Sequence, residues 1–312
     1  METSEAKESG MNVHEAIDQA CASVGIKPPR SFQPGRWTKT DTLSGKSGKG
    51  DGRIIVDDLK AVAWNHQTGE HQTVWLKDRK SLTPVERKEY AERKRKDEAE
   101  AQRRAGEAAR KAAQIVEAAK LSTHQYLAAK GFRDEKCLVA DAATVRQIAG
   151  EYLVAGDRAI VMPARFGSRV TSVQLIWEDG TKKFLAGGEI GGSSYRIAKG
   201  ADTWLCEGFA TGLSLRAALK GLRRSDTILC CFSASNLAQV ARSVKGRAFI
   251  AADHDKPVEQ FGWKGTGEHY AEVAGRPYFM PPEQGTDIND FHMEKGIFAV
   301  QKLVAEFMRC AR

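Results

Sequence analysis

The feature that most constrains the fold is a regular alternation, over residues 201–283, of short apolar runs with segments of helical composition. The runs are TWLCEG (203–208), TILCCF (227–232), RAFIAAD (247–253) and RPYFMPP (276–282). Continuous apolar runs between helices are typical of strands that are buried on both faces of a parallel sheet. The sequence therefore predicts an α/β fold in which a parallel four-stranded sheet is flanked by helices.

Acidic side chains stand where three of these runs end: Glu207 closes the first, Asp253 and Asp255 close the third, and Asp287 and Asp290 follow the fourth. Open α/β sheets bind ligands beyond the carboxyl ends of their strands, and residues i and i+2 of an extended chain share one side. Charges at the end of a buried strand are costly unless a cation compensates them. Oxygen ligands without a Cys or His pair favour Mg²⁺ or Mn²⁺ over zinc. Asp287 has a second interpretation, because it can also cap the helix that follows.

The whole chain divides by composition into five segments. We assign them to a small polar N-terminal module (1–80), a long basic helix (81–120), a mixed α/β segment (121–200), the α/β domain with the acidic side chains (201–295) and a C-terminal helix (296–312). No internal repeat at a solenoid period is visible.

The segment 81–120 is rich in Ala, Glu, Lys, Arg and Gln, which are strong helix formers. Ser81 or Thr83 together with Glu86 matches the capping-box pattern at its start. Apolar positions gather only near its end, so the helix is expected to start in solvent and to dock at its end. Its basic face is either a solvated surface or a contact for DNA.

Charge and cysteine usage narrow the class of protein. A net charge of +8 favours a polyanionic partner, although many basic proteins bind no nucleic acid. Six cysteines occur without a C-x-x-C pair, which argues against a zinc ribbon and a disulfide framework and favours buried free thiols. The first residues have no apolar core of a signal peptide, and no run of 18 apolar residues exists. These features predict a cytoplasmic protein without a membrane-spanning segment.

Several motifs resemble those of a known family. EGFATGLSL (207–215), AADHD (251–255) and TDINDF (286–291) resemble the Toprim domain of DNA primases. RAIVMPARF and KKFLAGG resemble the RNA-polymerase subdomain that precedes Toprim in bacterial primases. AAQIVEAAKLSTHQYLAAKGF (112–132) and FSASNLAQVA (232–241) are similar to primases of conjugative plasmids, integrative elements and phages. The resemblance covers roughly residues 110–295.

This resemblance implies a nucleotidyltransferase that makes short RNA primers from ribonucleoside triphosphates on single-stranded DNA. It implies that Asp253 and Asp255 hold Mg²⁺ or Mn²⁺ and that Glu207 assists proton transfer or completes the metal site. Asp287 and Asp290 would be outer or auxiliary ligands. The setting that it implies is a bacterial cell or a phage-infected bacterium.

The resemblance also places basic residues upstream of the acidic ones. Arg158, Arg165 and Lys183 lie where the family has basic residues that grip nucleotide and template. Their alternative interpretation is a solvated hairpin face, which for Lys182 is the favoured one.

The chain departs from many primases in two respects. It has no ligands for a zinc ribbon, so no zinc is expected, and its GKS at residues 45–47 lacks the earlier glycine of a Walker A motif, since position 40 is Thr. Without a fused helicase, a separate replicative helicase is the candidate partner.

The N-terminal module offers a substitute for the missing zinc ribbon. Its aromatic and basic residues alternate, and Trp37 is the position at which we expect a DNA base to stack. The alternative is that these aromatic residues form the core of a small domain. Two rival functions stay open: a Toprim nuclease that uses the same carboxylates, and a non-enzymatic replication adaptor that binds single-stranded DNA.

Overall fold

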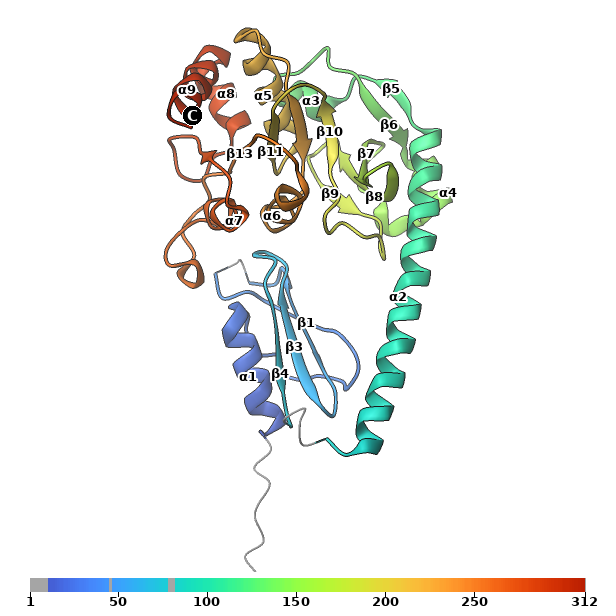
Figure 1. The fold of residues 1–312 in the computed structure, drawn as a ribbon. Coiled ribbons are helices and arrows are strands. Elements are labelled where there is room, and N and C mark those ends of the chain that lie inside the picture. The colour runs from blue at the N-terminus through green and yellow to red at the C-terminus, as the bar shows by residue number, and fades with distance from the viewer. Residues whose placement is uncertain (1–10, 45–46, 78–81, 312) are drawn as a thin grey trace, which may run out of the picture. The chain divides into compact units, whose positions relative to one another are not determined.

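The computed structural model describes residues 11–44, 47–77 and 82–311 (Figure 1). Contacts divide the chain into two compact units, one of residues 1–96 with 258–263 and the other of residues 97–257 with 264–312. The boundary at residue 96 falls inside helix α2 (Pro84–Ala118). Within the described ranges, no helix is long and apolar enough to cross a membrane.

The first unit is a helix packed on an antiparallel sheet. Helix α1 (Val13–Val24) begins with a capping box between Asn12 and Glu15. The strands lie side by side in chain order: β1 (Thr38–Thr40), β2 (Gly52–Val56), β3 (Lys60–Asn65) and β4 (His71–Trp75). Apolar side chains of α1 pack against alternate residues of β2 and β3, which gives this unit a hydrophobic core of its own.

Helix α2 has 35 residues and begins as the sequence predicts. The Thr83 amide donates to Glu86 Oε2 (2.8 Å) and the Glu86 amide donates to Thr83 Oγ1 (3.3 Å), which is a capping box; Ser81 lies outside the described residues. Its buried residues are Ala108, Ala112 and Ile115, all in its second half. The prediction that this helix docks at its end is confirmed, but its start does not lie wholly in solvent, because the Tyr90 ring contacts Trp75.

The second unit begins with an antiparallel five-stranded sheet. Its strands lie side by side in chain order: β5 (Lys120–Ser122), β6 (Cys137–Asp141), β7 (Arg158–Phe166), β8 (Arg169–Trp177) and β9 (Lys182–Phe184). The longest pairing in this sheet is the β7–β8 hairpin, which agrees with the mixed α/β character expected of this segment. Short helices connect the strands: the α-helices α3 (Gln125–Ala129) and α4 (Ala142–Ala149) and the 3₁₀ turn η1 (Glu151–Leu153).

The second sheet of this unit is the predicted parallel one. Its strands are β10 (Tyr195–Ala198), β11 (Thr203–Cys206), β12 (Thr227–Cys230), β13 (Ala248–Ala251) and β14 (Tyr278–Phe279). Their spatial order is β10-β12-β11-β13-β14, with parallel pairs everywhere except at β10, which is antiparallel to β12. The prediction of four strands was therefore one strand short, since β10 adds an antiparallel edge.

Helices cover both faces of the parallel sheet. One face carries α5 (Phe209–Gly221), α8 (Ile288–Lys295) and α9 (Ile297–Cys310), and the other carries α6 (Ala234–Ser243) and α7 (Thr266–Ala274). Alternation along β11 supplies both cores, because Trp204 packs among aromatic rings on the α9 side whereas Leu205 packs with α6 and α7. A short 3₁₀ turn, η2 (Glu259–Phe261), belongs to the first unit by its contacts.

Candidate active site

The topology of the parallel sheet defines where a ligand site belongs. In the sheet, β11 lies between β12 and β13, so the chain leaves β11 toward one edge, where β12 lies, and later returns to the other side of β11 with β13. The helix after β11 packs on one face, and the helices after β12 and β13 pack on the other. A switch point of this kind opens a crevice at the carboxyl ends of the two central strands.

Three of the predicted side chains lie at this switch point. Glu207 follows β11 directly, and Asp253 and Asp255 follow β13. The Cys231 and Phe232 amides donate to the carbonyls of Cys206 and Glu207, so β12 continues to pair beyond its own end and fixes the backbone at Glu207. The fold therefore brings together the carboxylates that the sequence motifs singled out.

Burial and mutual repulsion change the acidity of this cluster. Burial first, and then the charge of Asp255, raise the pKa of Glu207 to about 8. Burial and the neighbouring charge of Glu207 hold the pKa of Asp253 well above its ordinary value. The pKa of Asp255 is also raised, mainly by burial, although the Gly267 amide opposes the shift. Carboxylates that raise one another's pKa favour a cation among them.

The cluster fits a divalent cation in its chemistry. Oδ1 of Asp253 is buried and has no hydrogen-bond partner among the residues that the structure describes, which leaves a hard oxygen ligand unsatisfied. Within the same part of the chain, no three acidic, His or Cys side chains are positioned to chelate one ion. The side chains thus act on one another through charge without forming a closed coordination shell.

Asp255 has a second role at the start of α7. The Gly267 amide donates to Asp255 Oδ2 (2.9 Å), so this carboxylate caps the helix that follows it. The contact is close because both neighbouring positions are glycine: a Cβ on Gly265 would lie 2.6 Å from the Asp255 carbonyl oxygen, and one on Gly267 would lie 2.3 Å from that of Asp253. Sequence reasoning did not single out these glycines, although both occur in the motif KGTGE (264–268).

The two aspartates after the fourth run are arranged differently from one another. Asp287 caps α8 and forms a capping box with Asp290, as its second interpretation predicts. The charge of Asp287 also raises the pKa of Glu207, Asp253 and Asp255, so it lies within electrostatic reach of the cluster. Asp290 instead forms an ion pair with Lys130 (3.4 Å).

Among the lysine and arginine residues that the sequence singled out, Lys182 is the one whose charge acts on the cluster. Its positive charge lowers the pKa of both Glu207 and Asp253. Lys183 points elsewhere, since its ammonium donates to the carbonyl oxygens of Tyr152 (2.8 Å) and Val154 (2.9 Å).

The other three candidates for binding nucleotide or DNA lie outside the cluster. The Arg158 guanidinium donates to Ser122 Oγ (2.8 Å), and that of Arg165 donates to the Ser168 carbonyl (3.0 Å). Trp37 belongs to the first unit, where its side chain is 49% exposed.

The glycine-rich segment that precedes β10 is tied to the site by Asn236. The buried Asn236 side chain accepts from the Gly192 amide (2.7 Å) and donates to the carbonyls of Ser193 (2.8 Å) and Cys231 (2.7 Å). Phe232 lies between β12 and α6 with a φ of 72°, a conformation that bulky residues rarely adopt. Sequence reasoning did not single out either residue.

The cysteines near the site are structural. Cys206, Cys230 and Cys231 are buried and free, and burial raises the pKa of the Cys230 thiol to about 12. Neutral buried thiols behave as small apolar side chains, as the sequence predicts. Cys310 differs from that prediction because its side chain is exposed.

Comparison with known proteins agrees with the motifs of this region. Residues 202–297 match the family model of the Toprim domain, and they contain the parallel strands and all five acidic residues discussed above. Among solved structures, a chain in the complex of bacteriophage T7 lagging-strand DNA polymerase with the primase domains of two gp4 subunits, bound to an RNA/DNA hybrid and dTTP, is similar over 46% of this chain and 76% of its own length. Its identity is 14% and its TM-score 0.34. The family match makes residues 202–297 a Toprim-type domain.

Proposed function

We propose that this chain is a DNA primase that makes short RNA primers on single-stranded DNA from ribonucleoside triphosphates. The observation that carries the proposal is the carboxylate cluster of Glu207, Asp253 and Asp255, at the switch point of a Toprim-type sheet. The resemblance of the preceding segment to a primase polymerase subdomain favours synthesis over cleavage. The setting that we propose is replication of a plasmid, phage or mobile element, with a separate helicase as partner.

The cluster suits divalent-metal chemistry. Asp253 would be a principal ligand, because its Oδ1 is buried without a partner, and Asp255 would complete the site from the same strand end. Bound Mg²⁺ would reduce the repulsion between a 3′-hydroxyl and the incoming triphosphate and stabilise the departing pyrophosphate. Glu207, whose pKa is raised to about 8, is able to hold a proton on its carboxylate near neutral pH.

Lys182 supplies positive charge that acts on the carboxylate cluster. We propose that its ammonium binds a phosphate of the incoming nucleotide, because its charge already acts on Glu207 and Asp253. Lys183 would support the segment around Tyr152, through its hydrogen bonds to backbone carbonyls, more than it would bind nucleotide.

The test incubates the full chain with single-stranded DNA, labelled ribonucleoside triphosphates and Mg²⁺. Short labelled RNA on wild-type protein, absent with Asp253→Ala, supports the primase. Shortened DNA without RNA would identify a nuclease that uses the same carboxylates, and a shifted but unchanged strand would identify a binding adaptor. Either of the last two results overturns the proposal.

A further inference from the structure

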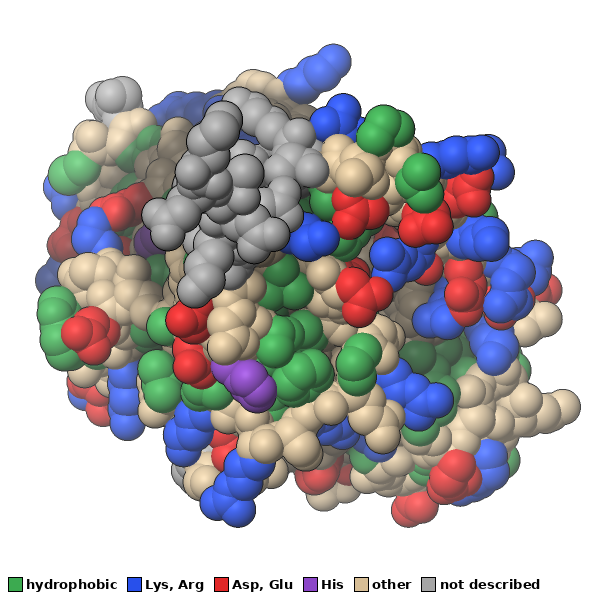
Figure 2. All heavy atoms as spheres, turned by 90° about the horizontal axis from the view of Figure 1, so that it is seen from below, with side chains coloured by type: hydrophobic (Ala, Val, Ile, Leu, Met, Phe, Trp, Pro, Cys, Tyr) green, Lys and Arg blue, Asp and Glu red, His purple; other side chains and the backbone are tan. Residues whose placement is uncertain are grey.

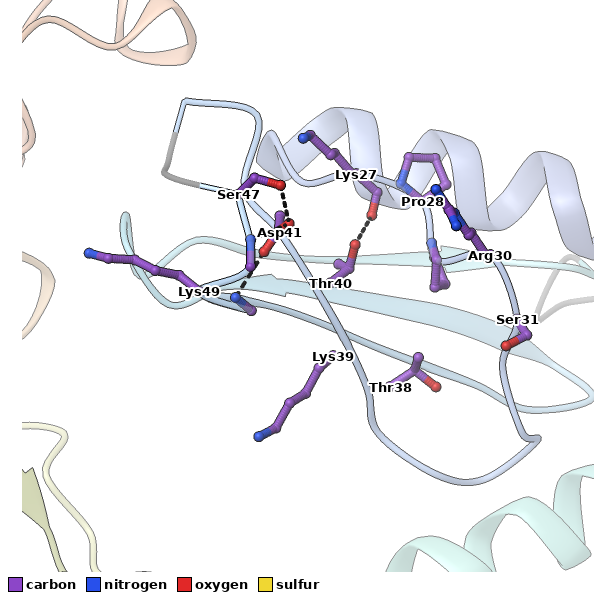
Figure 3. A pocket seen from close by; sticks show the side chains of 13 residues that line it. Lys27, Pro28, Arg30, Ser31, Thr38, Lys39, Thr40, Asp41, Ser47 and Lys49 are labelled. Carbon is purple, nitrogen blue, oxygen red and sulfur yellow. Dashed lines mark hydrogen bonds between the residues drawn. The ribbon is translucent and has the colours of Figure 1, made fainter.

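A basic pocket of about 670 Å³ lies in the first unit, well separated in sequence from the carboxylate cluster (Figure 3). Three segments line it: residues 27–31 after α1, strand β1, and the end of the connection between β1 and β2. The last of these carries the Gly-Lys-Gly of residues 48–50, which belongs to the basic loop around the incomplete Walker A motif.

Asp41 holds the walls of this pocket in place. Its carboxylate accepts the amides of Gly48 and Gly50 (2.9 Å each) and the Ser47 hydroxyl (3.3 Å), and these bonds lower its pKa. The Lys27 amide donates to the Asp41 carbonyl (2.8 Å). Both carboxylate oxygens of Asp41 therefore accept hydrogen bonds from the connection between β1 and β2. This acid stabilises the wall of the pocket.

The lining has four cations and one carboxylate. Lys27, Arg30, Lys39 and Lys49 carry the positive charges, and Asp41 is the single acid among the lining residues. In the described ranges, none of these four cations forms an ion pair, although Lys27 lies close enough to lower the pKa of Asp41. The pocket thus has an excess of positive charge that nothing described in the chain neutralises.

The excess of positive charge in this pocket contrasts with the mixed charges on the face of the molecule that Figure 2 shows. On the face drawn in Figure 2, Lys and Arg side chains lie interspersed with Asp and Glu side chains. The net charge of +8 therefore does not form one unbroken basic surface there, and a local group of cations marks a specific site better than the overall charge does.

We propose that this pocket binds the phosphodiester backbone of single-stranded DNA. Lys39 and Lys49 extend away from the strands, whereas Lys27 and Arg30 stand on the opposite wall, so the cations are spread along the pocket (Figure 3). Cations that are spread over a pocket, and not gathered at one point, can contact more than one phosphate of an extended strand. The hydroxyls of Ser31 and Thr38 add donors for phosphate oxygens.

Two further observations favour a strand over a free nucleoside triphosphate. A triphosphate site gathers its cations at one point and holds a metal ion by a carboxylate, but here the cations are spread and Asp41 is engaged by its own loop. Trp37 directly precedes Thr38 of the lining and is 49% exposed, which offers a ring on which a base can stack. The inference rests on the proposed function only in naming the bound strand as a template.

The test compares two full-length triple variants that each remove three positive charges. One is Lys27→Ser with Lys39→Ser and Lys49→Ser, in the pocket. The matched control is Lys199→Ser with Lys220→Ser and Lys245→Ser. These three exposed lysines lie near the ends of β10, α5 and α6, at the end of the sheet where the parallel strands begin. Affinity for a labelled oligothymidylate of about 20 nucleotides is measured by anisotropy, without Mg²⁺, over a range of NaCl concentrations.

We expect the pocket variant to bind roughly tenfold more weakly at about 100 mM salt, and its log–log salt slope to fall by about 2, because each lost phosphate contact reduces the slope by roughly 0.7. The control variant should keep the wild-type slope. A third variant, with arginine at the three pocket positions, should keep both affinity and slope, which separates lost charge from lost folding.

Equal loss in the pocket and control variants, or no loss in either, would overturn the inference. So would a pocket variant that binds the oligonucleotide normally but loses binding of ATP, since that result would identify a nucleotide site. The outcome is independent of the proposed activity. An Asp253→Ala protein should lose synthesis yet keep the wild-type salt slope, and a wild-type protein that makes no RNA could still lose strand binding through the pocket variant.

Discussion

At Asp253, burial, like charge and an unsatisfied oxygen coincide in one side chain. Asp290, by contrast, is part of a helix cap and pairs with Lys130. We therefore expect Asp253→Asn to reduce primer synthesis by on the order of 10³-fold, because a principal metal ligand is lost. Asp290→Asn should keep most of the activity. Steady-state assays of both variants with Mg²⁺ measure the difference, and equal losses would contradict the distinction between the two aspartates.

Glu207 gives the chain a pH-dependent stability. Its pKa is about 8 in the folded protein against an ordinary value of 4.5, so the unfolded state loses its proton first as the pH rises. The stabilisation that the protonated carboxyl contributes is complete below about pH 4.5 and is lost as the pH rises through about 8.

In the presence of EDTA, the melting temperature of the wild-type protein should therefore fall between pH 5 and 8 more steeply than that of Glu207→Gln, whose side chain stays neutral. Added Mg²⁺ should raise the wild-type melting temperature most at the upper end of this range. Thermal unfolding followed by circular dichroism provides the measurement. Parallel curves for the two proteins would show that Glu207 is not the group responsible.

The sequence could predict some side chains of the candidate site but not others. Glu207, Asp253 and Asp255 were predictable because each ends an apolar run, and the end of a parallel strand fixes where its next residues lie. The different roles of Lys182 and Lys183 could not be predicted, because neighbours on a strand face opposite sides and only the register of β9 decides which of the two charges acts on the cluster. Asn236 was hidden for a similar reason, since its partners are as many as 44 residues away along the chain.

Among the elements, those with strong local signals were predictable. The parallel strands β11, β12, β13 and β14 are apolar and lie between helices, and α2 has a composition that favours no other structure. Strand β10 was missed because it has four residues with a mixed burial pattern, and long-range pairing with β12 is what defines it.

The start of α7 provides a test at the level of an element. A Cβ at Gly267 would lie 2.3 Å from the Asp253 carbonyl oxygen, so Gly267→Ala must push the helix away from the segment that carries Asp253 and Asp255. We expect a loss of about 1–3 kcal/mol in the free energy of unfolding, together with a loss of synthesis.

The matched control is Gly106→Ala in α2, where an added Cβ meets no atom within 4 Å. Helix propensity alone predicts that this variant gains about 0.5–1 kcal/mol and keeps full activity. Denaturant unfolding and primer synthesis of both proteins give the comparison. A Gly267→Ala protein that matches wild type in both measurements would show that the close approach has no effect on the site.

The whole molecule has two units with separate hydrophobic cores, which α2 connects along the chain. The first turns of α2 belong to the first unit, because the Tyr90 ring contacts Trp75 (5.7 Å between centroids). Its last turns belong to the second unit, since Ala108, Ala112 and Ile115 are buried there. Residues 91–104 lie between these anchors and are exposed throughout.

Among the residues that the structure describes, an exposed helical stretch of this kind should be the first place where a protease cuts. Isolated helices are marginal in water, so residues 91–104 are stabilised by local hydrogen bonds and by pairs such as Glu100 with Arg104. Local opening there costs far less than opening of either core. Limited trypsin digestion should therefore cleave first between Arg93 and Arg104, which mass spectrometry of the fragments would show. Early cleavage inside residues 120–250 would mean that the second unit opens before the helix does, contrary to the separate cores on which this expectation rests.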